Sequence, residues 1–242
     1  MNRDRFDQVI YENWANHFGC SLATLHQGGT TILPREKYAG TRVIVFWHIG
    51  QHAFVQLDPD YGREVDCLLH RLPEMMALSG DDLRCAWGEA AASSHDRYMV
   101  YYLYPEDLPG YAPPAPFVLR PLSDADGGLM QALQAANSIE DVDEGYVEVT
   151  HQIVYGCFAG EQLVAAASGY DHAGFMDIGV LTHPEFRRKG LGKSVVGAIC
   201  DWSLRNRFIA QYRFNAQNGG SQCVAESLNF KRYFWSESIW MI

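Results

Sequence analysis

The chain has 242 residues, of which 48% are apolar and 20% are charged. This composition is typical of a soluble globular protein and provides enough apolar side chains for one large domain or two small ones. The formal net charge is −10, and the isoelectric point calculated from the sequence is about 5.3. Because nucleic-acid binding depends on basic surface, these values argue against a nucleic-acid partner.

The sequence carries no sign of export, membrane insertion or metal binding. Residues 1–6 lack the apolar core of a signal peptide, and no run of about 18 apolar residues occurs, so we expect a cytoplasmic protein without a membrane partner. The six cysteines show no Cys-x-x-Cys spacing, which predicts neither zinc nor a disulfide framework. His48, His52, His151 and His172 have no metal-ligand spacing with carboxylates, and we interpret them as structural or surface residues.

The first part of the chain is predicted to form a small α+β domain. Apolar residues recur at helical spacing from Phe6 to Phe18, which predicts a helix over 4–18. The apolar runs 42–47 and 53–57 predict the two strands of a hairpin. Further expected elements are a helix over 63–78 that Pro73 kinks or divides, a helix over 80–89 opened by Asp81 and Asp82, and an aromatic strand over 98–103.

A proline-rich stretch follows this domain. Five of the ten prolines fall between Pro105 and Pro116, where the periodic pattern disappears. Because proline restricts φ and removes backbone donors, we interpret the stretch as a stiff connector and place a domain boundary near residue 111. The expected domains are therefore residues 1–110 and 111–242.

The second domain is predicted to mix strands and helices. Residues 117–122 read as a strand, and Ser123 to Asp126 signal the start of a helix. The remaining expected elements are strands over 151–158, 162–168 and 175–181, a helix that ends near Arg205, a strand over 209–214, a helix over 221–228 and a final aromatic strand or hairpin over 233–241.

The most informative stretch joins the strand that ends at Leu181 to the following helix. It reads THPEFRRKGLG over residues 182–192. The first turn of a helix has N–H groups without helical partners and the positive end of the dipole, so it favours an anion. Gly190 and Gly192 allow a phosphate to approach the backbone, and the three basic residues before them add positive charge. The stretch therefore predicts a pyrophosphate cradle.

The spacing Arg-x-x-Gly-x-Gly is weak evidence by itself, because about one chain in ten of this length would contain it by chance. Its position between a predicted strand and a predicted helix gives it a mechanism. Two other phosphate-binding patterns, Gly-x-x-x-x-Gly-Lys-Ser/Thr and Gly-x-Gly-x-x-Gly, do not fit this stretch.

Residues 182–192 resemble the acyl-CoA-binding motif of the GNAT superfamily of N-acetyltransferases. A second match follows, because Asn218 stands where those proteins carry an asparagine, Ser221 where they carry a small residue, and residues 228–230 read Leu-Asn-Phe where Leu-Gly-Phe is usual. The resemblance implies an α/β (α+β) fold over about residues 117–242, with a mixed twisted sheet of the GNAT type. Residues 1–110 would be a small accessory α+β domain before it.

The resemblance also implies acetyl-CoA as the acyl donor. The backbone N–H groups of residues 187–192 would hold its pyrophosphate, and the strand end 180–182 would hydrogen-bond its pantetheine arm. Asn218 would contact the donor as well, or would serve only as a helix cap or turn residue. The implied donor-binding residues are Val180, Leu181, Thr182, Arg187, Arg188, Lys189, Gly190, Leu191, Gly192, Lys193, Asn218 and Ser221.

Acyl transfer to an amine needs a proton acceptor for the ammonium group and a proton donor for the departing thiolate. Asp177 is the candidate base, because it lies in an apolar strand that leads to the donor loop and burial would raise its pKa; alternatively, it is only ion-paired or faces solvent. The superfamily commonly has a tyrosine as general acid seven residues after the asparagine, where this chain has Ala225. Tyr212, Ser221 or water would then protonate the thiolate.

We therefore predict an N-acetyltransferase that moves an acetyl group from acetyl-CoA to a primary amine of a small molecule or peptide. Glu144 and Glu148 lie where such proteins have a substrate lip, although most such charges are simply solvated. The alternative is a non-catalytic acyl-CoA-binding or sensing module, which Ala225 and Asn229 favour. Nucleic-acid binding through residues 187–189 is opposed by the net charge. The sequence does not determine the oligomeric state, and a homodimer is one possibility.

Overall fold

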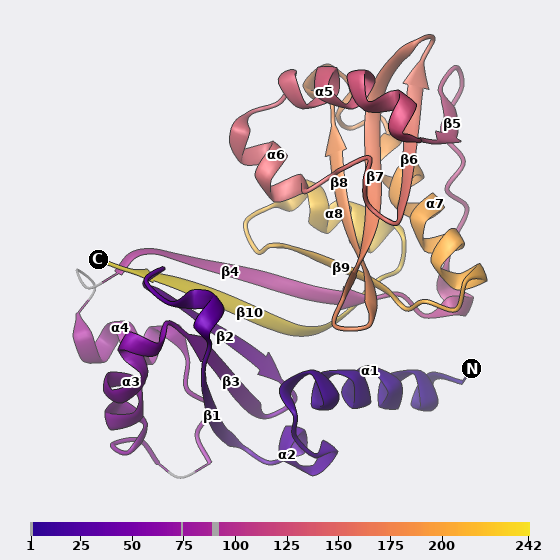
Figure 1. Cartoon of the computed structure of the whole chain (residues 1–242). Coiled ribbons are helices and arrows are strands. Elements are labelled where there is room, and N and C mark those ends of the chain that lie inside the picture. The colour runs from indigo at the N-terminus through magenta and orange to yellow at the C-terminus, as the bar shows by residue number, and fades with distance from the viewer. Residues whose placement is uncertain (1, 74, 89–91) are drawn as a thin grey trace. The chain divides into compact units, whose positions relative to one another are not determined.

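The computed structural model describes residues 2–73, 75–88 and 92–242. The chain divides into two compact units (Figure 1). Unit 1 comprises the chain up to Val100 together with Tyr233–Ile242, and unit 2 comprises Tyr101–Arg232. The first boundary thus lies before the proline-rich stretch, whereas the sequence places it near residue 111. The last strand belongs to unit 1, whereas the sequence assigns it to the second domain.

The proline-rich stretch belongs to unit 2 because it is packed on a helix of that unit, α7 (Leu191–Arg205). A Cβ atom at Gly197 of this helix would lie only 2.3 Å from Tyr111 Cβ, so the glycine makes the contact possible. The Tyr111 hydroxyl donates a hydrogen bond to Asp201, at 2.7 Å. The proline-rich stretch, which lacks sequence periodicity, is therefore packed on α7 and does not serve only as a connector.

Unit 1 is built on a mixed sheet. Its strands lie in the order β1 (Gly29–Pro34), β3 (His52–Leu57), β2 (Val43–Ile49), β10 (Lys231–Met241) and β4 (Ala92–Tyr102). The strands β2 and β3 form the predicted antiparallel hairpin, which is confirmed, and β1 runs parallel to β3. The strand β10 pairs antiparallel with β2, so the end of the chain completes a sheet made from its beginning.

Different helices cover the two faces of this sheet. The helices of unit 1 are α1 (Arg3–Phe18), α2 (Leu22–His26), α3 (Gly62–Leu69) and α4 (Gly80–Trp87). Because side chains alternate along a strand, Trp47 faces α1, where its ring lies 4.9 Å from that of Trp14. Phe46 points to the opposite face, into a core that α3 and α4 close with Val65 and Leu83.

Several expectations for unit 1 need correction. The sequence predicts a helix over 63–78, but α3 ends at Leu69, before Pro73. The predicted helix over 80–89 is α4, which a capping box between Ser79 and Asp82 opens; residue 89 lies outside the described residues. The elements β1 and α2 are short, and the sequence analysis did not predict them.

Unit 2 also has a mixed sheet, with the strand order β9 (Ala210–Asn215), β8 (Phe175–Thr182), β7 (Gln162–His172), β6 (Ile153–Ala159) and β5 (Val118–Pro121). Its neighbours are antiparallel except for β8 and β9, which are parallel. The helices are α5 (Gly127–Ala135), α6 (Ile139–Gly145), α7 and α8 (Gly219–Ser227). The predicted mixed α/β fold is confirmed.

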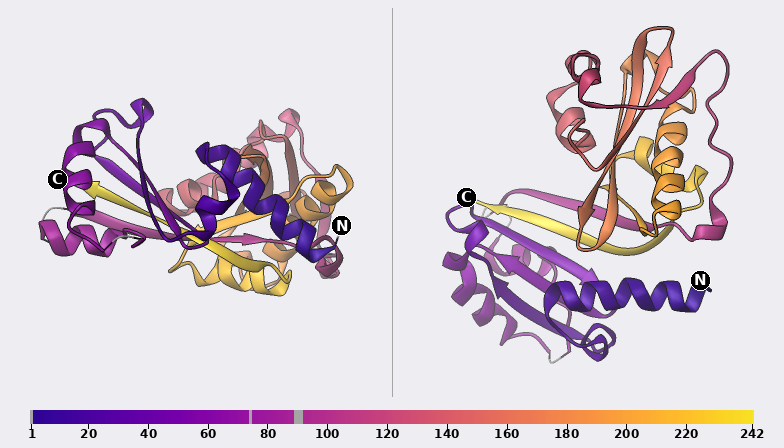
Figure 2. Two further views of the ribbon diagram at one scale, coloured as in Figure 1. Left: turned by 90° about the horizontal axis from the view of Figure 1, so that it is seen from below. Right: turned by 45° about the vertical axis from the view of Figure 1, so that its right-hand side comes forward.

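The helices of unit 2 form two layers around its sheet. In Figures 1 and 2, α5 and α6 lie on one side of strands β6 to β8 and α7 on the other. Met130 and Leu133 of α5 pack with Leu181 of β8 in one core. On the other side, α7 buries Val195, Val196 and Ile199, the apolar face expected from the sequence.

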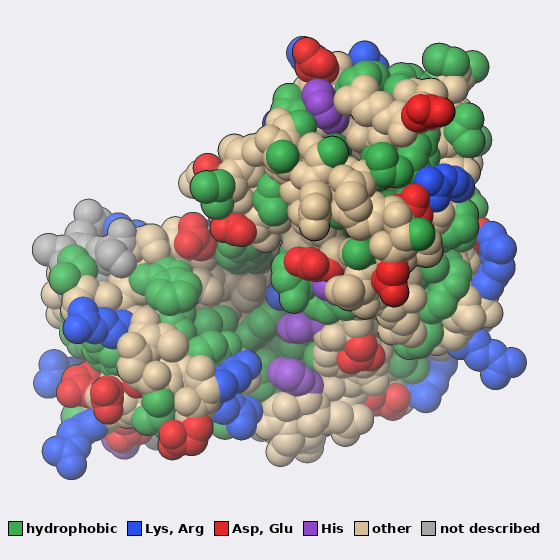
Figure 3. All heavy atoms as spheres, turned by 45° about the horizontal axis from the view of Figure 1, so that its top comes forward, with side chains coloured by type: hydrophobic (Ala, Val, Ile, Leu, Met, Phe, Trp, Pro, Cys, Tyr) green, Lys and Arg blue, Asp and Glu red, His purple; other side chains and the backbone are tan. Residues whose placement is uncertain are grey.

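The surface of the chain mixes charges of both signs. Figure 3 shows Asp and Glu side chains interspersed with Lys and Arg on the face it presents. Within the described residues, no helix has the length and apolar character needed to cross a membrane.

Candidate functional site

The candidate site in unit 2 lies where two parallel strands part. The strands β8 and β9 are paired only from Met176–Ile178 to Ala210–Tyr212, although β8 continues to Thr182 and β9 to Asn215. A cavity of about 640 Å³ lies at this opening. Because pairing with β9 stops there, the edge of β8 beyond Ile178 presents backbone groups to the cavity.

The cavity wall contains all but one of the twelve predicted donor-binding residues. Those on the wall are Val180, Leu181, Thr182, Arg187, Arg188, Gly190, Leu191, Gly192, Lys193, Asn218 and Ser221. The wall also includes Tyr212, the predicted proton donor. Lys189 and Asp177 are not on it.

One end of the cavity is the N-terminus of α7. Gly190 is the N-cap residue, in the left-handed region at φ +79°, and no side chain caps this end. The hydrogen bond from Ser194 N–H to Gly190 O is the first of the helix, so the N–H groups of residues 191–193 have no acceptor within it. This end can bind an anion, as the sequence predicts.

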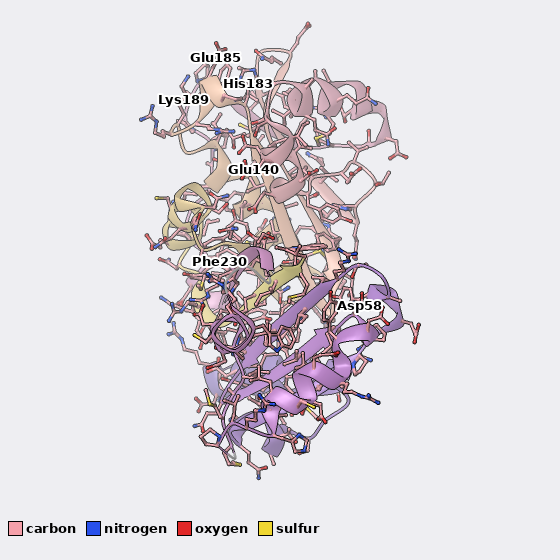
Figure 4. All side chains as sticks on the ribbon, turned by 90° about the vertical axis from the view of Figure 1, so that its left-hand side faces the viewer. Asp58, Glu140, His183, Glu185, Lys189 and Phe230 are labelled. Carbon is pink, nitrogen blue, oxygen red and sulfur yellow. The ribbon has the colours of Figure 1, made fainter. Side chains whose placement is uncertain are left out.

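The basic residues of the loop differ in what they contact. Arg187 donates hydrogen bonds to Asn137 and Asp141, at 2.8 and 3.0 Å, which ties the loop to the α5–α6 segment. Lys189 is exposed, with its Nζ 4.6 Å from the centre of the Phe186 ring. Figure 4 labels Lys189 together with His183 and Glu185 of the same loop.

Arg188 has a strained backbone. Its φ of +62° lies in the left-handed region, which an arginine rarely adopts. Such strain is kept only where the surroundings impose it, and it concentrates at functional sites. Arg188 is exposed and lies on the cavity wall, beside the free end of α7.

The opposite wall comes from α8. Asn218 is its N-cap residue, and its Oδ1 accepts a hydrogen bond from Ser221 N–H at 3.0 Å. The helix-cap role that the sequence analysis considered for Asn218 is thus confirmed, in a residue that also lines the cavity. Gly192 faces this helix closely, because a Cβ atom there would lie 3.3 Å from Val224 Cγ2.

Tyr212 has a buried hydroxyl group on the cavity wall. The residue is 1% exposed, and its hydroxyl oxygen has no hydrogen-bond partner among the described residues. Burial raises its pKa well above the ordinary value, an effect that the nearby Ser221 hydroxyl opposes. The phenol therefore remains protonated at neutral pH and can donate a proton or hydrogen bond into the cavity.

Asp177 is buried beside the cavity and is ion-paired. Its Oδ2 accepts hydrogen bonds from Arg213 Nε at 2.7 Å, from Arg213 Nη2, and from the Tyr170 hydroxyl at 2.9 Å. This is the ion-paired alternative considered from the sequence. Because Oδ2 is already engaged by Arg213 and Tyr170, the pairing argues against Asp177 as the base. Arg213, which Asp177 holds, does line the cavity.

The departures from the family motif have structural explanations. Ala225 is fully buried, and the hydroxyl groups on the cavity wall include those of Tyr212 and Ser221. Asn229 adopts φ +64°, the left-handed conformation for which glycine is usual, and asparagine tolerates this region better than most residues. Its side chain donates a hydrogen bond to Asp107 O, at 2.9 Å.

The sequence analysis named Glu144 as a candidate substrate-lip residue but did not predict α6, the acidic helix that carries it. Asp141 and Glu144 of α6 line the cavity, and Figure 4 labels Glu140 on the same helix. Ser138 caps α6 through a hydrogen bond from Asp141 N–H at 3.1 Å, so the spacing Ser-x-x-Asp was the available signal. Arg213 also lines the cavity and carried no recognisable motif, whereas Phe186 lines it from within the motif 182–192.

In unit 2, two parallel strands of a mixed sheet part over a cavity that has a helix N-terminus at one end. Residues 151–234 match the family model described as GNAT acetyltransferase. The match confirms the sequence resemblance over these residues. The matched family is one of acyltransferase enzymes.

Solved structures show the same fold at low sequence identity. A GNAT-family acetyltransferase from Colwellia psychrerythraea has a TM-score of 0.52 and 13% identity, over 78% of this chain and 76% of that one. A GCN5-related N-acetyltransferase from Sphaerobacter thermophilus has a TM-score of 0.52 and 10% identity, over 77% and 71%. A conserved protein of unknown function from Staphylococcus epidermidis has a TM-score of 0.54 and 10% identity, over 76% and 79%.

Not every matched structure is covered so fully. The chain spans 65% and 57% of the length of two others, the second a Drosophila protein. A search of curated protein sequences finds no match.

Proposed function

We propose that the chain is an N-acetyltransferase that binds acetyl-CoA in the cavity of unit 2 and transfers the acetyl group to a primary amine of a small molecule or peptide. The observation that carries this proposal is the parting of β8 and β9 beside the free N-terminus of α7. A donor with a phosphate group at one end and a reactive thioester at the other matches a cavity with an anion-binding end and a buried proton donor.

The chain's own groups would divide the work of binding. The N–H groups at the start of α7, with Arg188 and Lys193, would hold the pyrophosphate. The edge of β8 at Val180 and Thr182 would hydrogen-bond the amide groups of the pantetheine arm. Asn218 has its Oδ1 engaged as a helix cap, so only its amide nitrogen is left to contact the donor. Lys189, off the wall, would add only to the local field.

Two groups would act on the reaction at the buried end of the cavity. The Tyr212 hydroxyl would supply the proton that the departing thiolate needs, because it is protonated at neutral pH and lies on the cavity wall. Asp177 would act through Arg213, by holding the guanidinium at the cavity wall. Acidic residues Asp141 and Glu144 on the same wall would attract an acceptor that arrives as an ammonium ion.

Binding of acetyl-CoA by calorimetry tests the proposal, with Gly190→Glu as the blocking variant. A glutamate at residue 190 would place a carboxylate at the anion-binding end, so we expect affinity to fall at least about tenfold. Gly160→Glu is a matched control. Gly160 lies in the same unit at φ +61°, and like Gly190 it has open space around the position of a Cβ atom. Both variants therefore carry the same charge change and similar backbone strain.

Three results would separate the possibilities. Binding that is lost only in Gly190→Glu, with release of free CoA when amines are added, would support the acetyltransferase. Binding without turnover over a broad panel of amines would favour the alternative of an acyl-CoA-binding or sensing module. If the wild-type protein does not bind acetyl-CoA, the proposal fails.

A cytoplasmic location stays a prediction, which fractionation of the source cells would test.

A further inference from the structure

A histidine lies in a hydrogen-bonded cluster that the proposed function has not used. His151 Nδ1 is 2.8 Å from the hydroxyl of Ser168, a fully buried residue of β7. The His151 ring is 5.0 Å from the rings of both Tyr146 and Tyr170, and those two rings are 5.1 Å apart. The three rings thus pack against one another, with one imidazole among them.

The Ser168 hydroxyl lies near two groups that can accept its proton. Its oxygen is 2.8 Å from His151 Nδ1 and 3.5 Å from the carbonyl oxygen of Tyr146, and it accepts a hydrogen bond from Glu148 N–H at 3.4 Å. When the hydroxyl proton points to Tyr146, His151 Nδ1 carries a proton and donates it to the hydroxyl oxygen. In this tautomer Nε2 carries a lone pair and can accept a proton.

The chain around Tyr146 is built to hold this arrangement. Tyr146 ends α6 in the left-handed region, at φ +43°, which is a strained conformation for a tyrosine. Its carbonyl lies over Gly179, where a Cβ atom would be 2.7 Å from the Tyr146 oxygen and 2.2 Å from that of Gly145. The absence of a side chain at Gly179 therefore lets this segment pack on β8, within reach of Ser168.

The cluster adjoins the cavity through neighbours of Tyr146, Ser168 and Tyr170. Gly145, the residue before Tyr146, is on the cavity wall, and so is Gly179, the strand partner of Ser168. The Tyr170 hydroxyl accepts a hydrogen bond from Arg213, which is also on the wall, at 3.2 Å. The cluster and the buried end of the cavity are thus neighbours within unit 2.

The charged groups around His151 favour a cationic ligand and a neutral imidazole. Burial lowers the pKa of His151, and Glu148 opposes this effect. The other titratable neighbours are the phenols of Tyr146 and Tyr170, with Asp177 and Arg213 paired behind Tyr170. Tyr146 is 51% exposed, so the cluster is open on one side. Aromatic faces and a nearby carboxylate suit an ammonium group.

We propose that this cluster receives the acceptor amine and that Nε2 of His151 takes the proton of its ammonium group, with Ser168 as the residue that positions the imidazole. The proposal rests on the proposed acetyl transfer and identifies the acceptor as an ammonium ion that binds against the exposed aromatic side of the cluster. The sequence analysis interpreted His151 as structural or surface because it has no metal-ligand spacing with carboxylates. Its partner Ser168 is distant in the sequence and gives no motif.

The proton balance follows from these positions. The ammonium group gives one proton to Nε2, and the freed lone pair forms a bond to the thioester carbon. The C–S bond breaks, and the sulfur leaves with its electron pair. The second proton lost by the nitrogen ends on the thiol, by way of the Tyr212 hydroxyl. His151 returns its proton to water on the open side of the cluster, so the products are an amide, free CoA and one proton.

The first test is direct observation of the histidine tautomer by ¹H–¹⁵N NMR of the full chain, with His151→Asn to assign the signal. At neutral pH we expect His151 to be protonated at Nδ1 only, and n-butylammonium to shift its Nε2 resonance. A proton found on Nε2, or a resonance that does not respond to the amine, would overturn the proposal. This result does not depend on turnover, so it can fail separately from the calorimetric test of acetyl-CoA binding.

The second test is the pH dependence of acetyl transfer by His151→Asn. The shorter amide can still donate to Ser168, which preserves the cluster, but it has no basic nitrogen. We expect kcat/KM to fall by about a hundredfold near neutral pH. The decrease of the wild-type rate below the pKa of His151 should disappear, and the rate should rise with pH towards the pKa of the free amine, about 10.

A histidine outside the cluster provides the control. His172 is in the same unit, near Gln211, and His172→Asn should keep the wild-type pH profile. Ser168→Ala should lower kcat more than it changes the affinity for acetyl-CoA, and added imidazole should partly restore the activity of His151→Ala. An unchanged pH profile in His151→Asn would show that another group takes the proton.

Discussion

At the scale of single residues, the buried hydroxyl of Tyr212 carries a free-energy cost that packing in a core does not explain. A buried hydroxyl without a partner usually destabilises a fold, because it has given up its hydrogen bonds to water. Tyr212 keeps such a hydroxyl on the wall of the donor cavity. A bound thioester or thiolate would give the hydroxyl the partner that it lacks.

We expect Tyr212→Phe to separate function from stability. The variant removes only the unpartnered oxygen, so the melting temperature should stay the same or rise. Since the thiolate would lose its proton donor, kcat should fall by about tenfold to a hundredfold while the affinity for acetyl-CoA changes little. Steady-state kinetics, calorimetry and thermal unfolding of one preparation measure all three. A lower melting temperature with unchanged kcat would make Tyr212 a structural residue only.

Replacement of Asp177 should lower stability, in contrast to replacement of Tyr212. Its side chain is 3% exposed and its partner Arg213 is largely buried, so Asp177→Asn leaves a buried guanidinium without its counter-charge. Breaking a buried pair from one side costs about 3 kcal/mol of unfolding free energy. We expect urea unfolding to show a loss of this size. Asp171→Asn, at an exposed position of β7, should cost less than about 0.5 kcal/mol.

The pH dependence of acetyl transfer distinguishes the two roles considered for Asp177. If Asp177 only holds Arg213, then Asp177→Asn should lower kcat at every pH by a similar factor. A selective loss of rate below the pKa of the amine, with stability intact, would instead restore Asp177 as the base.

At the scale of elements, the sequence specifies the proposed donor side of the cavity better than the proposed acceptor side. The strand β8, the glycine loop and α7 are contiguous, so periodicity, glycine spacing and charge all describe one local structure. The helix α6 has seven residues, which is too few for a periodic apolar pattern. The N-cap residue Ser138 was the only sequence signal that indicated it. The cavity itself could not be predicted, because it results from where β8 and β9 stop pairing.

Contacts between distant segments explain the other limits of prediction. The pairing of Asp177 with Arg213 joins two strands separated by α7, and Ser168 meets His151 across a hairpin. Such pairs leave no pattern in one sequence, because each partner is an ordinary polar residue in its own segment. The Tyr111 contact with Gly197 has the same character, which is why the boundary of unit 2 lies before the proline-rich stretch.

At the scale of the whole molecule, unit 2 is inserted within the sequence of unit 1. The strand β10 follows all of unit 2 in the chain and pairs with β2 near the beginning. Unit 1 therefore cannot complete its sheet until the C-terminal residues are available. The group that fixes β10 there is Glu237, which is fully buried.

The Glu237 carboxylate is held from three elements. It is bonded to His48 of β2 at 3.0 Å, to His95 of β4 at 2.6 Å, and to Gly80 N–H at the start of α4 at 2.7 Å. Burial alone would raise its pKa, but the hydrogen bonds from His48, from Gly80 and from His95 outweigh it. The pKa of Glu237 is lowered to about 2, from an ordinary value of 4.5.

This shift predicts how acid should unfold unit 1. Because the pKa of Glu237 is lower in the folded than in the unfolded chain, its stabilising effect is complete above about pH 4.5 and is lost as the pH falls towards 2. A shift of this size corresponds to about 3 kcal/mol of unfolding free energy. Five of the six tryptophans lie in unit 1, at positions 14, 47, 87, 235 and 240, so tryptophan fluorescence reports mainly on this unit.

Urea unfolding at a series of pH values between 6 and 2.5, followed by this fluorescence, measures the effect. Glu237→Gln should be less stable at pH 6 and should lose less stability on acidification than the wild-type protein, because it has no carboxylate to protonate. Glu64→Gln, at an exposed position of α3, should keep the wild-type pH dependence. Equal acid sensitivity in all three proteins would mean that other groups control acid unfolding, and that Glu237 does not join the end of the chain to its beginning.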